Sequence, residues 1–475
     1  MIAHIAHIAR AALAGLVLLL MAACSTTKPW MNAPVPADAP VQEQPAVAPE
    51  PRPIIAAVTL SGGGARAAAF GLGVLQELNA TRFELGGRET TLLDEVGLVS
   101  GVSGGSILAS YYAAFGNETF ARFERDFLLV NFQSGLIRQA TSPVTLYDMT
   151  SPWYGRSNVL QKRLEQVYRG TTYGDLRRQR PWPHLLVTAT DLTTGAPFEF
   201  TPEQFALICS DLDSVPLSVA VAASSSVPLL LSPITVRNYG GSCASAARTH
   251  GEPNAPRNLS ARFLRMIAQS YGNAQQRPYI HLVDGGLADN LGVRGLVNHT
   301  IASGSLHENF RELPPGSVHR IVLIVVNSER DMADRIDQSD RVPGTLQILD
   351  SLIFGAGSRW TEETTAIVKD AASRAAEEIR QARGRKDSPF ASDAEIFVIN
   401  VRLRDLADKE RRQTLLHLPT AFEILPAHSR QLQEAGREVL RASPEYQRLR
   451  RSLGLETTSV AAADADAEGA QEAQP

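Results

Sequence analysis

The sequence lacks three features that would each indicate a particular class of protein. Its 46 Lys and Arg residues are balanced by 50 Asp and Glu residues, for a formal net charge of −4. This balance argues against a nucleic-acid-binding protein, which normally carries a basic patch or a strongly basic composition. No internal repeat is present. The apolar run near the N-terminus, residues 11–23, has 13 residues, whereas a helix that spans a bilayer needs roughly 20.

The N-terminal run has the length of the hydrophobic region of a secretory signal peptide. The small pair of residues before Cys24 resembles the lipoprotein box of bacteria, in which the cysteine is acylated and becomes the mature N-terminus. Met21 stands where the box usually has leucine, so a plain secretory signal with an incidental cysteine is the alternative. We predict a signal peptide over residues 1–23 and lipid attachment at Cys24. Ser25 resembles the residue that follows the cysteine in lipoproteins sorted to the outer membrane.

Cysteine is otherwise scarce, with only Cys209 and Cys243 after the predicted anchor. A compartment beyond a secretory signal permits oxidation. A disulfide between these two residues would contribute roughly 3–4 kcal/mol by restricting the unfolded chain. Two free buried thiols are the alternative interpretation.

Composition divides the rest of the chain into segments. Residues 24–53 are rich in proline and alanine and predict a semi-extended tether. Residues 54–330 contain the motifs described below and predict a catalytic core, with a helical and strand extension over 331–454 packed on it. Residues 455–475 are acidic and poor in bulky side chains, which predicts a disordered tail.

Short apolar runs alternate with helical patterns through the core. The strongest predicted strands are 54–60, 184–192, 278–286, 319–327 and 394–403, and the clearest later helices are 361–382 and 429–442. Such alternation predicts an α/β fold, a three-layer α/β/α sandwich with a mainly parallel central sheet. Ligands of such folds collect at the carboxyl ends of the strands.

Ser103 lies in Gly101-Val102-Ser103-Gly104-Gly105, a G-x-S-x-G sequence between a predicted strand and a predicted helix. In such a turn the serine adopts a strained backbone conformation, and neighbours without Cβ atoms leave its hydroxyl accessible. The helix N-terminus beside it favours a developing negative charge. We predict that Ser103 is a nucleophile; the alternative is a turn serine that caps the helix.

A second glycine turn, Gly62-Gly63-Gly64, follows the strand 54–60. Successive glycines let backbone N–H groups converge on one anion, as an oxyanion hole requires. A Walker phosphate loop is not supported, because no Lys-Ser/Thr pair follows. Arg66, in the first helical turn, is a candidate contact for an anionic head group or the partner of a carboxylate.

Asp284 ends the strand HLVD and precedes two glycines. A carboxylate at this place can reach a serine at the same edge of the sheet, although a plain Asp-Gly turn is the alternative. The ten histidines offer no comparable base. Alternation sends His281 to the opposite face of its strand, and His417 and His428 fall in a region that predicts a surface helix. The residues therefore favour a Ser103–Asp284 dyad over a histidine triad.

These motifs resemble the patatin-like phospholipase family. SGGGAR, GVSGG and DGGLADN occur in the family's order, and TDLTTGAPFEF and AVAASSSVPLLLSP resemble the blocks between nucleophile and aspartate. The resemblance covers roughly residues 54–295. It implies a three-layer α/β/α fold, a Ser103–Asp284 dyad and an oxyanion hole at the glycine turn. It also implies that neither a metal nor another cofactor is needed, and that Asp191 and Ser224–Ser226 support the site.

The expected function is hydrolysis of fatty-acyl esters in phospholipids or lysophospholipids by a lipid-anchored enzyme of the bacterial envelope. A carboxylesterase that acts on soluble esters is one alternative. A lipoprotein without catalytic activity, which binds lipid or a partner, is the other.

Overall fold

The structure is a computed structural model. It describes residues 25–36, 52–243, 258–329, 340–344, 348, 351 and 356–455. The predicted signal peptide, Cys24 and the predicted tail from residue 456 onward lie outside these residues. Within the described part of the chain, no helix has both the length and the apolar character that a bilayer-spanning helix requires.

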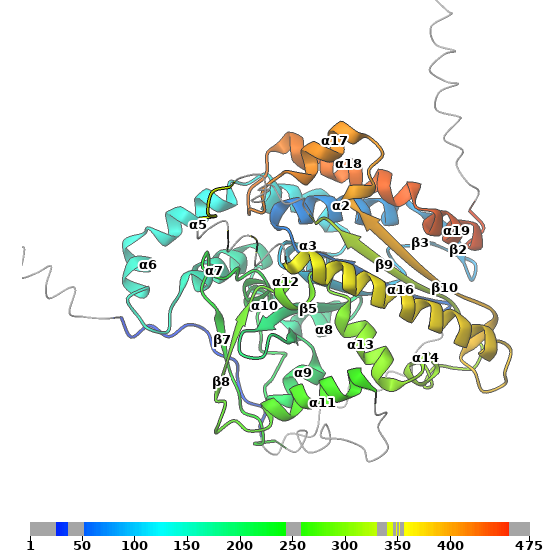
Figure 1. Ribbon diagram of the computed structural model, residues 1–475, viewed down its shortest axis with the longest axis horizontal. Coiled ribbons are helices and arrows are strands. Elements are labelled where there is room, and N and C mark those ends of the chain that lie inside the picture. Colours follow the sequence, from blue (N-terminus) through cyan, green and yellow to red (C-terminus); the bar gives the residue numbers. More distant parts are fainter. Residues whose placement is uncertain are drawn as a thin grey trace, which may run out of the picture.

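The centre of the molecule is an eight-stranded sheet with the order β10-β9-β1-β4-β5-β8-β7, in which β6 also pairs with β5 (Figure 1). The first five strands of this order are parallel, and β6, β7 and β8 join through antiparallel pairs. A separate hairpin contains β2 and β3. The strands are β1 Ile54–Leu60, β2 Arg82–Leu85, β3 Arg88–Thr91, β4 Val96–Val102, β5 His184–Asp191, β6 Pro197–Glu199, β7 Ile234–Arg237, β8 Tyr279–Val283, β9 Val318–Asn327 and β10 Phe390–Arg402.

Helices fill the connections between the strands. Those of the first half are α2 Gly64–Ala80, α3 Gly104–Phe115, α4 Glu118–Phe123, α5 Phe132–Ala140, α6 Pro143–Asp148, α7 Arg156–Tyr168, α8 Tyr173–Gln179, α9 Pro202–Leu207 and α10 Leu217–Ser224. Those of the second half are α11 Leu259–Tyr271, α12 Gly286–Asp289, α13 Arg294–Ser303, α14 Leu306–Asn309, α16 Ala356–Ala382, α17 Lys409–Leu416, α18 Pro426–Ala442 and α19 Pro444–Ser452.

Strand β9 shows why the fold has three layers. Side chains alternate between the two faces of a strand. Val322, Ile324 and Val326 belong to the apolar cluster that includes α2, α3 and α18. Leu323 and Val325 instead pack in a cluster with α16. Helices therefore cover both faces of the sheet, with α2 and α18 on one side and α16 on the other (Figure 1), and the predicted α/β/α fold is confirmed.

One strand runs against the sequence expectation. The sheet was predicted to be mainly parallel, but strand β8, which precedes Asp284, pairs antiparallel with both β5 and β7. Its first residues lie beyond the carboxyl edge of the parallel strands, and it runs inward until Val283 pairs with Thr190. Apolar alternation gives the same pattern for either strand direction, so the sequence could not distinguish them.

The C-terminal region contributes a strand to the central sheet and does not only pack on the outside of the core. Strand β10 is the edge strand, and it pairs along the length of β9. Helix α18 packs on α2, where Gly436 approaches the Phe70 carbonyl so closely that a Cβ would lie 2.4 Å from its oxygen. The boundary predicted at residue 330 therefore divides one structural unit.

Residues 25–36, which belong to the predicted tether, lie against the folded domain. Asn32 is 1% exposed. Its side chain donates to Ser210 Oγ at 2.7 Å and to the Arg237 carbonyl at 2.9 Å, and accepts from the Arg237 amide at 2.6 Å. Trp30 packs against the main apolar cluster. The proline-rich composition predicted a segment with few side chains to bury. Asn32 and Trp30 are nevertheless enough to hold it against the domain.

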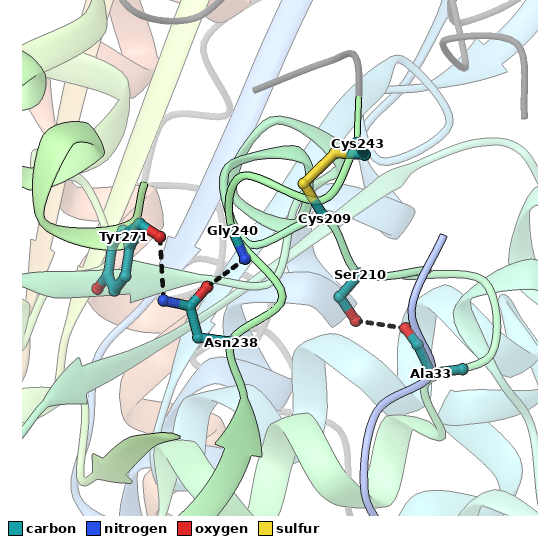
Figure 2. Close-up of a disulfide and its surroundings, with 7 residues drawn as sticks. All are labelled: Ala33, Cys209, Ser210, Asn238, Gly240, Cys243 and Tyr271. Carbon is teal, nitrogen blue, oxygen red and sulfur yellow. Dashed lines mark hydrogen bonds between the residues drawn. A yellow bond between two sulfur atoms is a disulfide. The ribbon is translucent and has the colours of Figure 1, made fainter. Parts of the chain in front are cut away.

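A disulfide links Cys209 to Cys243 beside this segment (Figure 2). Next to Cys209, Ser210 Oγ donates to the Ala33 carbonyl at 2.8 Å, and the Val35 amide donates to the Cys209 carbonyl at 2.9 Å. The disulfide and the N-terminal segment therefore brace the same loop.

The buried amide of Asn32 predicts a measurable effect on stability. Asn32→Ala would leave the Arg237 amide and carbonyl without their partner, and we expect it to lower the free energy of unfolding by about 2 kcal/mol. Urea unfolding of the oxidised protein measures this. Thr26→Ala, on the exposed part of the same segment, is the matched control, and an equal effect of the two substitutions would contradict the prediction.

Candidate active site

Ser103 lies at the junction between β4 and α3 with a strained backbone. Its φ is 49° and its ψ is −121°, a region that residues with a side chain rarely occupy and that costs about 1–3 kcal/mol. The conformation is held by its surroundings, because the Ser103 amide donates to Ser224 Oγ at 2.8 Å and Ser224 Oγ donates to the Thr188 carbonyl at 2.6 Å. Helix α3 begins at the next residue, so its positive end lies beside the hydroxyl.

The two glycine turns are in direct backbone contact. A Cβ on Gly104 would lie 2.1 Å from the Gly64 carbonyl oxygen and 2.4 Å from its nitrogen. A Cβ on Gly62 would lie 3.4 Å from the Cβ of Ser103. Gly63 and Gly64 have φ values of 138° and 62°, which glycine adopts without steric cost. The turn after β1 thus lies against the nucleophile turn after β4.

Asp284 is the acid that the structure brings to Ser103. It is 8% exposed, and burial raises the pKa of its carboxyl to about 6, partly offset by hydrogen bonds from the Gly286 amide and from Ser103. The Gly286 amide lies 2.8 Å from Asp284 Oδ1. The Asp284 backbone is fixed by Thr190, whose hydroxyl donates to its carbonyl at 2.7 Å.

Sheet register explains how these two residues meet. In the β4–β5 pair, Val102 stands opposite Thr188, and in the β5–β8 pair, Val283 stands opposite Thr190. Continuing each pair by one residue places Ser103 and Asp284 on either side of Ala189. The inward, antiparallel course of β8 therefore delivers Asp284 to the level of the nucleophile.

The three amides of the glycine turn differ in whether another group accepts their hydrogen. Within the described residues, no acceptor takes the amide hydrogens of Gly63 and Gly64. The Gly62 amide was predicted to join them, but it donates to the Asn290 carbonyl at 3.1 Å. Its hydrogen is committed to that bond, so only the amides of Gly63 and Gly64 are available to an oxyanion.

Arg66 lies under this turn rather than on the surface. Its side chain is almost fully buried, with Nη1 3.5 Å from the Leu418 carbonyl, and its Nη2 lies 3.0 Å from the position of a Cβ on Gly63. The loop that contains Leu418 also supplies Ala421, whose carbonyl accepts the Ala65 amide at 2.7 Å. The C-terminal region therefore covers the first turn of α2, which no sequence signal indicated.

The histidines that were considered as bases have other partners. His281 Nδ1 lies 2.9 Å from Thr235 Oγ1, and His417 Nδ1 lies 2.6 Å from the Gln413 carbonyl of its own helix. His428 is half-buried in the first turn of α18. None of these contacts leads to Ser103.

Residues expected to support the site have structural partners. Asp191 is fully buried, accepts the Tyr271 hydroxyl at 2.8 Å and forms an ion pair with Arg277. A further acid, the half-buried Glu199, was missed. Burial and the negative charges of Asp289 and Glu203 raise its pKa to about 7.

The chain is similar to one family of known proteins and to several solved structures. The family model described as patatin-like phospholipase matches residues 58–297. Among solved structures, human GIVD cytosolic phospholipase A2 is 14% identical over 58% of this chain, with a TM-score of 0.34, and the match covers 45% of that protein. VipD from Legionella pneumophila is 13% identical over 88% of this chain and 71% of its own, with a TM-score of 0.31.

No curated protein matches the sequence. The family match covers 240 of the 475 residues, from position 58 through position 297. It contains the glycine turn after β1, the serine turn after β4 and the aspartate after β8. This chain therefore belongs to the patatin-like phospholipase family.

Proposed function

We propose that the protein is a lipid acyl hydrolase of the phospholipase A or lysophospholipase type. The observation that carries this proposal is that the sheet register brings Ser103 to a buried Asp284, whose pKa is raised to about 6. An aspartate with its ordinary pKa near 3.9 is a weak base. A carboxylate that titrates closer to neutral pH and still ionises there accepts a hydroxyl proton more readily.

The proposed reaction has two steps. Asp284 takes the Ser103 proton as Oγ attacks the ester carbonyl, and the amides of Gly63 and Gly64 donate to the oxyanion of the tetrahedral intermediate. The intermediate collapses to an acyl-enzyme, and Asp284 returns the proton to the leaving alcohol. Water, deprotonated by Asp284, then attacks the acyl-enzyme, and Asp284 returns this proton to Ser103 Oγ as the fatty acid is released.

We also propose that the enzyme works at a membrane. A lipid on Cys24 would hold it at the bacterial outer membrane, as the residues around this cysteine indicate. Several acyl chains, at about 0.8 kcal/mol for each buried methylene, suffice for stable attachment. Mass spectrometry of the mature N-terminus tests this directly.

Hydrolysis by variants tests the dyad. We expect Ser103→Ala and Asp284→Asn each to lower kcat/KM on phospholipid or lysophospholipid by at least about a hundredfold, because each removes a group that takes part in proton transfer or attack. Released fatty acids are identified by mass spectrometry. Ser110→Ala is the matched serine control, since this buried hydroxyl on α3 has no partner in the described structure.

Three outcomes would contradict this assignment. Activity on short soluble esters alone would indicate a carboxylesterase. Absence of hydrolysis, with no labelling of Ser103 by a fluorophosphonate, would indicate a lipoprotein without catalytic activity. A loss in His428→Ala as large as that in Asp284→Asn would indicate a histidine base.

The raised pKa of Asp284 predicts the pH dependence. The base must be ionised, so kcat/KM is expected to be level above pH 6 and to fall about tenfold per pH unit below it, as protonation of Asp284 removes the base. Initial rates on a soluble ester across the range measure the midpoint. Glu199→Gln removes another carboxyl whose pKa is raised and should leave the midpoint near 6, whereas a midpoint that moves in this variant would contradict the assignment.

A further inference from the structure

An exposed apolar surface lies on α5, α6 and the loop that follows α6. We call it the α6 surface and define it by Ile137, Val144, Leu146, Tyr147 and Trp153. Val144 is 72% exposed and Trp153 is 53% exposed, and the other three are about as exposed as Trp153. These five large apolar side chains lie within 17 consecutive residues, from 137 to 153, a higher local density than the single exposed apolar residues that are normal on a protein surface.

The segment that carries the α6 surface has more basic than acidic residues. From residue 129 to residue 164 the basic residues are Arg138, Arg156, Lys162 and Arg163, and the only acidic residue is Asp148. Asp148 is buried and accepts from Lys162 Nζ at 3.3 Å and from Thr27 Oγ1 at 3.0 Å. The exposed charges of this segment therefore favour a negatively charged partner.

The N-terminal segment begins at the same place. The Ser25 amide donates to Thr150 Oγ1 at 2.8 Å, and Ser151 Oγ donates to the Thr27 carbonyl at 2.7 Å. Lys28 Nζ lies 5.2 Å from the centre of the Trp153 ring. Ser25 directly follows Cys24, and consecutive Cα atoms lie about 3.8 Å apart. The residue that follows the predicted lipid attachment site is therefore fixed beside the α6 surface.

Two further exposed leucines connect this surface with the dyad. Leu229 and Leu230 are 60% and 66% exposed. Arg156, at the start of α7, donates to the Leu229 carbonyl at 2.6 Å. The same loop includes Ser226, whose carbonyl accepts the Asp284 amide at 2.9 Å. The loop that carries these two leucines and holds the proposed base is therefore bound to the start of α7, three residues after Trp153.

We propose that the α6 surface docks on a lipid bilayer with anionic head groups. Val144 and Leu146 enter the acyl boundary, and Tyr147 and Trp153 lie at the head-group level, where their amphipathic rings are favoured. The basic side chains contact the head groups. The inference deepens the proposed function and rests on it, since the docked bilayer supplies the substrate, and it gives residues 25–36 the role of fixing the lipid anchor next to the docking surface.

Local insertion can be measured separately from hydrolysis. The full chain with Cys24→Ser and Ser103→Ala has no free thiol besides one that is added, because Cys209 and Cys243 form a disulfide. An environment-sensitive fluorophore is attached at Leu146→Cys. The control carries it at Leu259→Cys on α11, where Leu259 is 80% exposed. Vesicles contain equal parts of phosphatidylethanolamine and phosphatidylglycerol. We expect emission to rise at least about twofold at position 146 and to stay unchanged at position 259.

A second set of variants connects docking with activity. Val144→Ser, Leu146→Ser and Tyr147→Ser are combined, and Leu259→Ser with Met266→Ser on α11 is the matched control. We expect the α6 combination to weaken vesicle binding about tenfold or more and to reduce vesicle lipid hydrolysis. Hydrolysis of a short soluble ester should stay within about twofold of wild type, because no altered residue contacts the dyad.

The outcomes separate the two proposals. If the wild-type protein docks on vesicles but hydrolyses none of their lipid, the docking surface is supported and the proposed function is contradicted. Unchanged emission at position 146, or equal vesicle binding by both combinations, would overturn the docking surface. Equal loss on soluble esters would show that α6 shapes the active site instead. Self-association that disappears in the α6 combination while vesicle binding persists would assign the surface to a second copy of the chain and overturn the proposal.

Discussion

The backbone contact between Gly104 and Gly64 is the constraint on which the site depends. A single methyl group at position 104 would lie 2.1 Å from the Gly64 carbonyl oxygen, so a side chain there would force the two turns apart. Because the turns follow adjacent parallel strands, β1 and β4, their approach brings the N-termini of α2 and α3 together. The strained serine and the two uncommitted amides are neighbours as a consequence.

The acid reaches this place by a different route. Asp284 follows an antiparallel strand that enters the sheet from the carboxyl edge, and it ends beside β5 under almost complete burial. Burial disfavours the charged form, which raises the pKa, and the same burial costs stability whenever the carboxylate is ionised. The fold thus tolerates an unfavourable charge at neutral pH in exchange for a base that matches the proposed chemistry.

Local features of the site could be predicted from the sequence, and long-range ones could not. The strand 54–60 and the strand–turn–helix settings of Ser103 and Gly63 follow from short patterns, because each depends on residues close in the chain. The direction of β8 depends on its partners, which apolar alternation does not specify. The Gly62 amide is engaged by Asn290, more than two hundred residues away. The packing of residues 25–36 against the domain could not be predicted for a related reason. It depends on single side chains such as Asn32, which hydrogen-bonds to Ser210 and Arg237, and a composition averages over all residues of a segment.

The Ala421 carbonyl closes over the first turn of α2 through its bond to the Ala65 amide, and this has a consequence for the order in which the proposed site is completed. Ser103 and Asp284, the proposed nucleophile and base, precede position 421 by more than a hundred residues in the chain. The turn that is proposed to bind the oxyanion is therefore covered only after a much later part of the chain has packed against it.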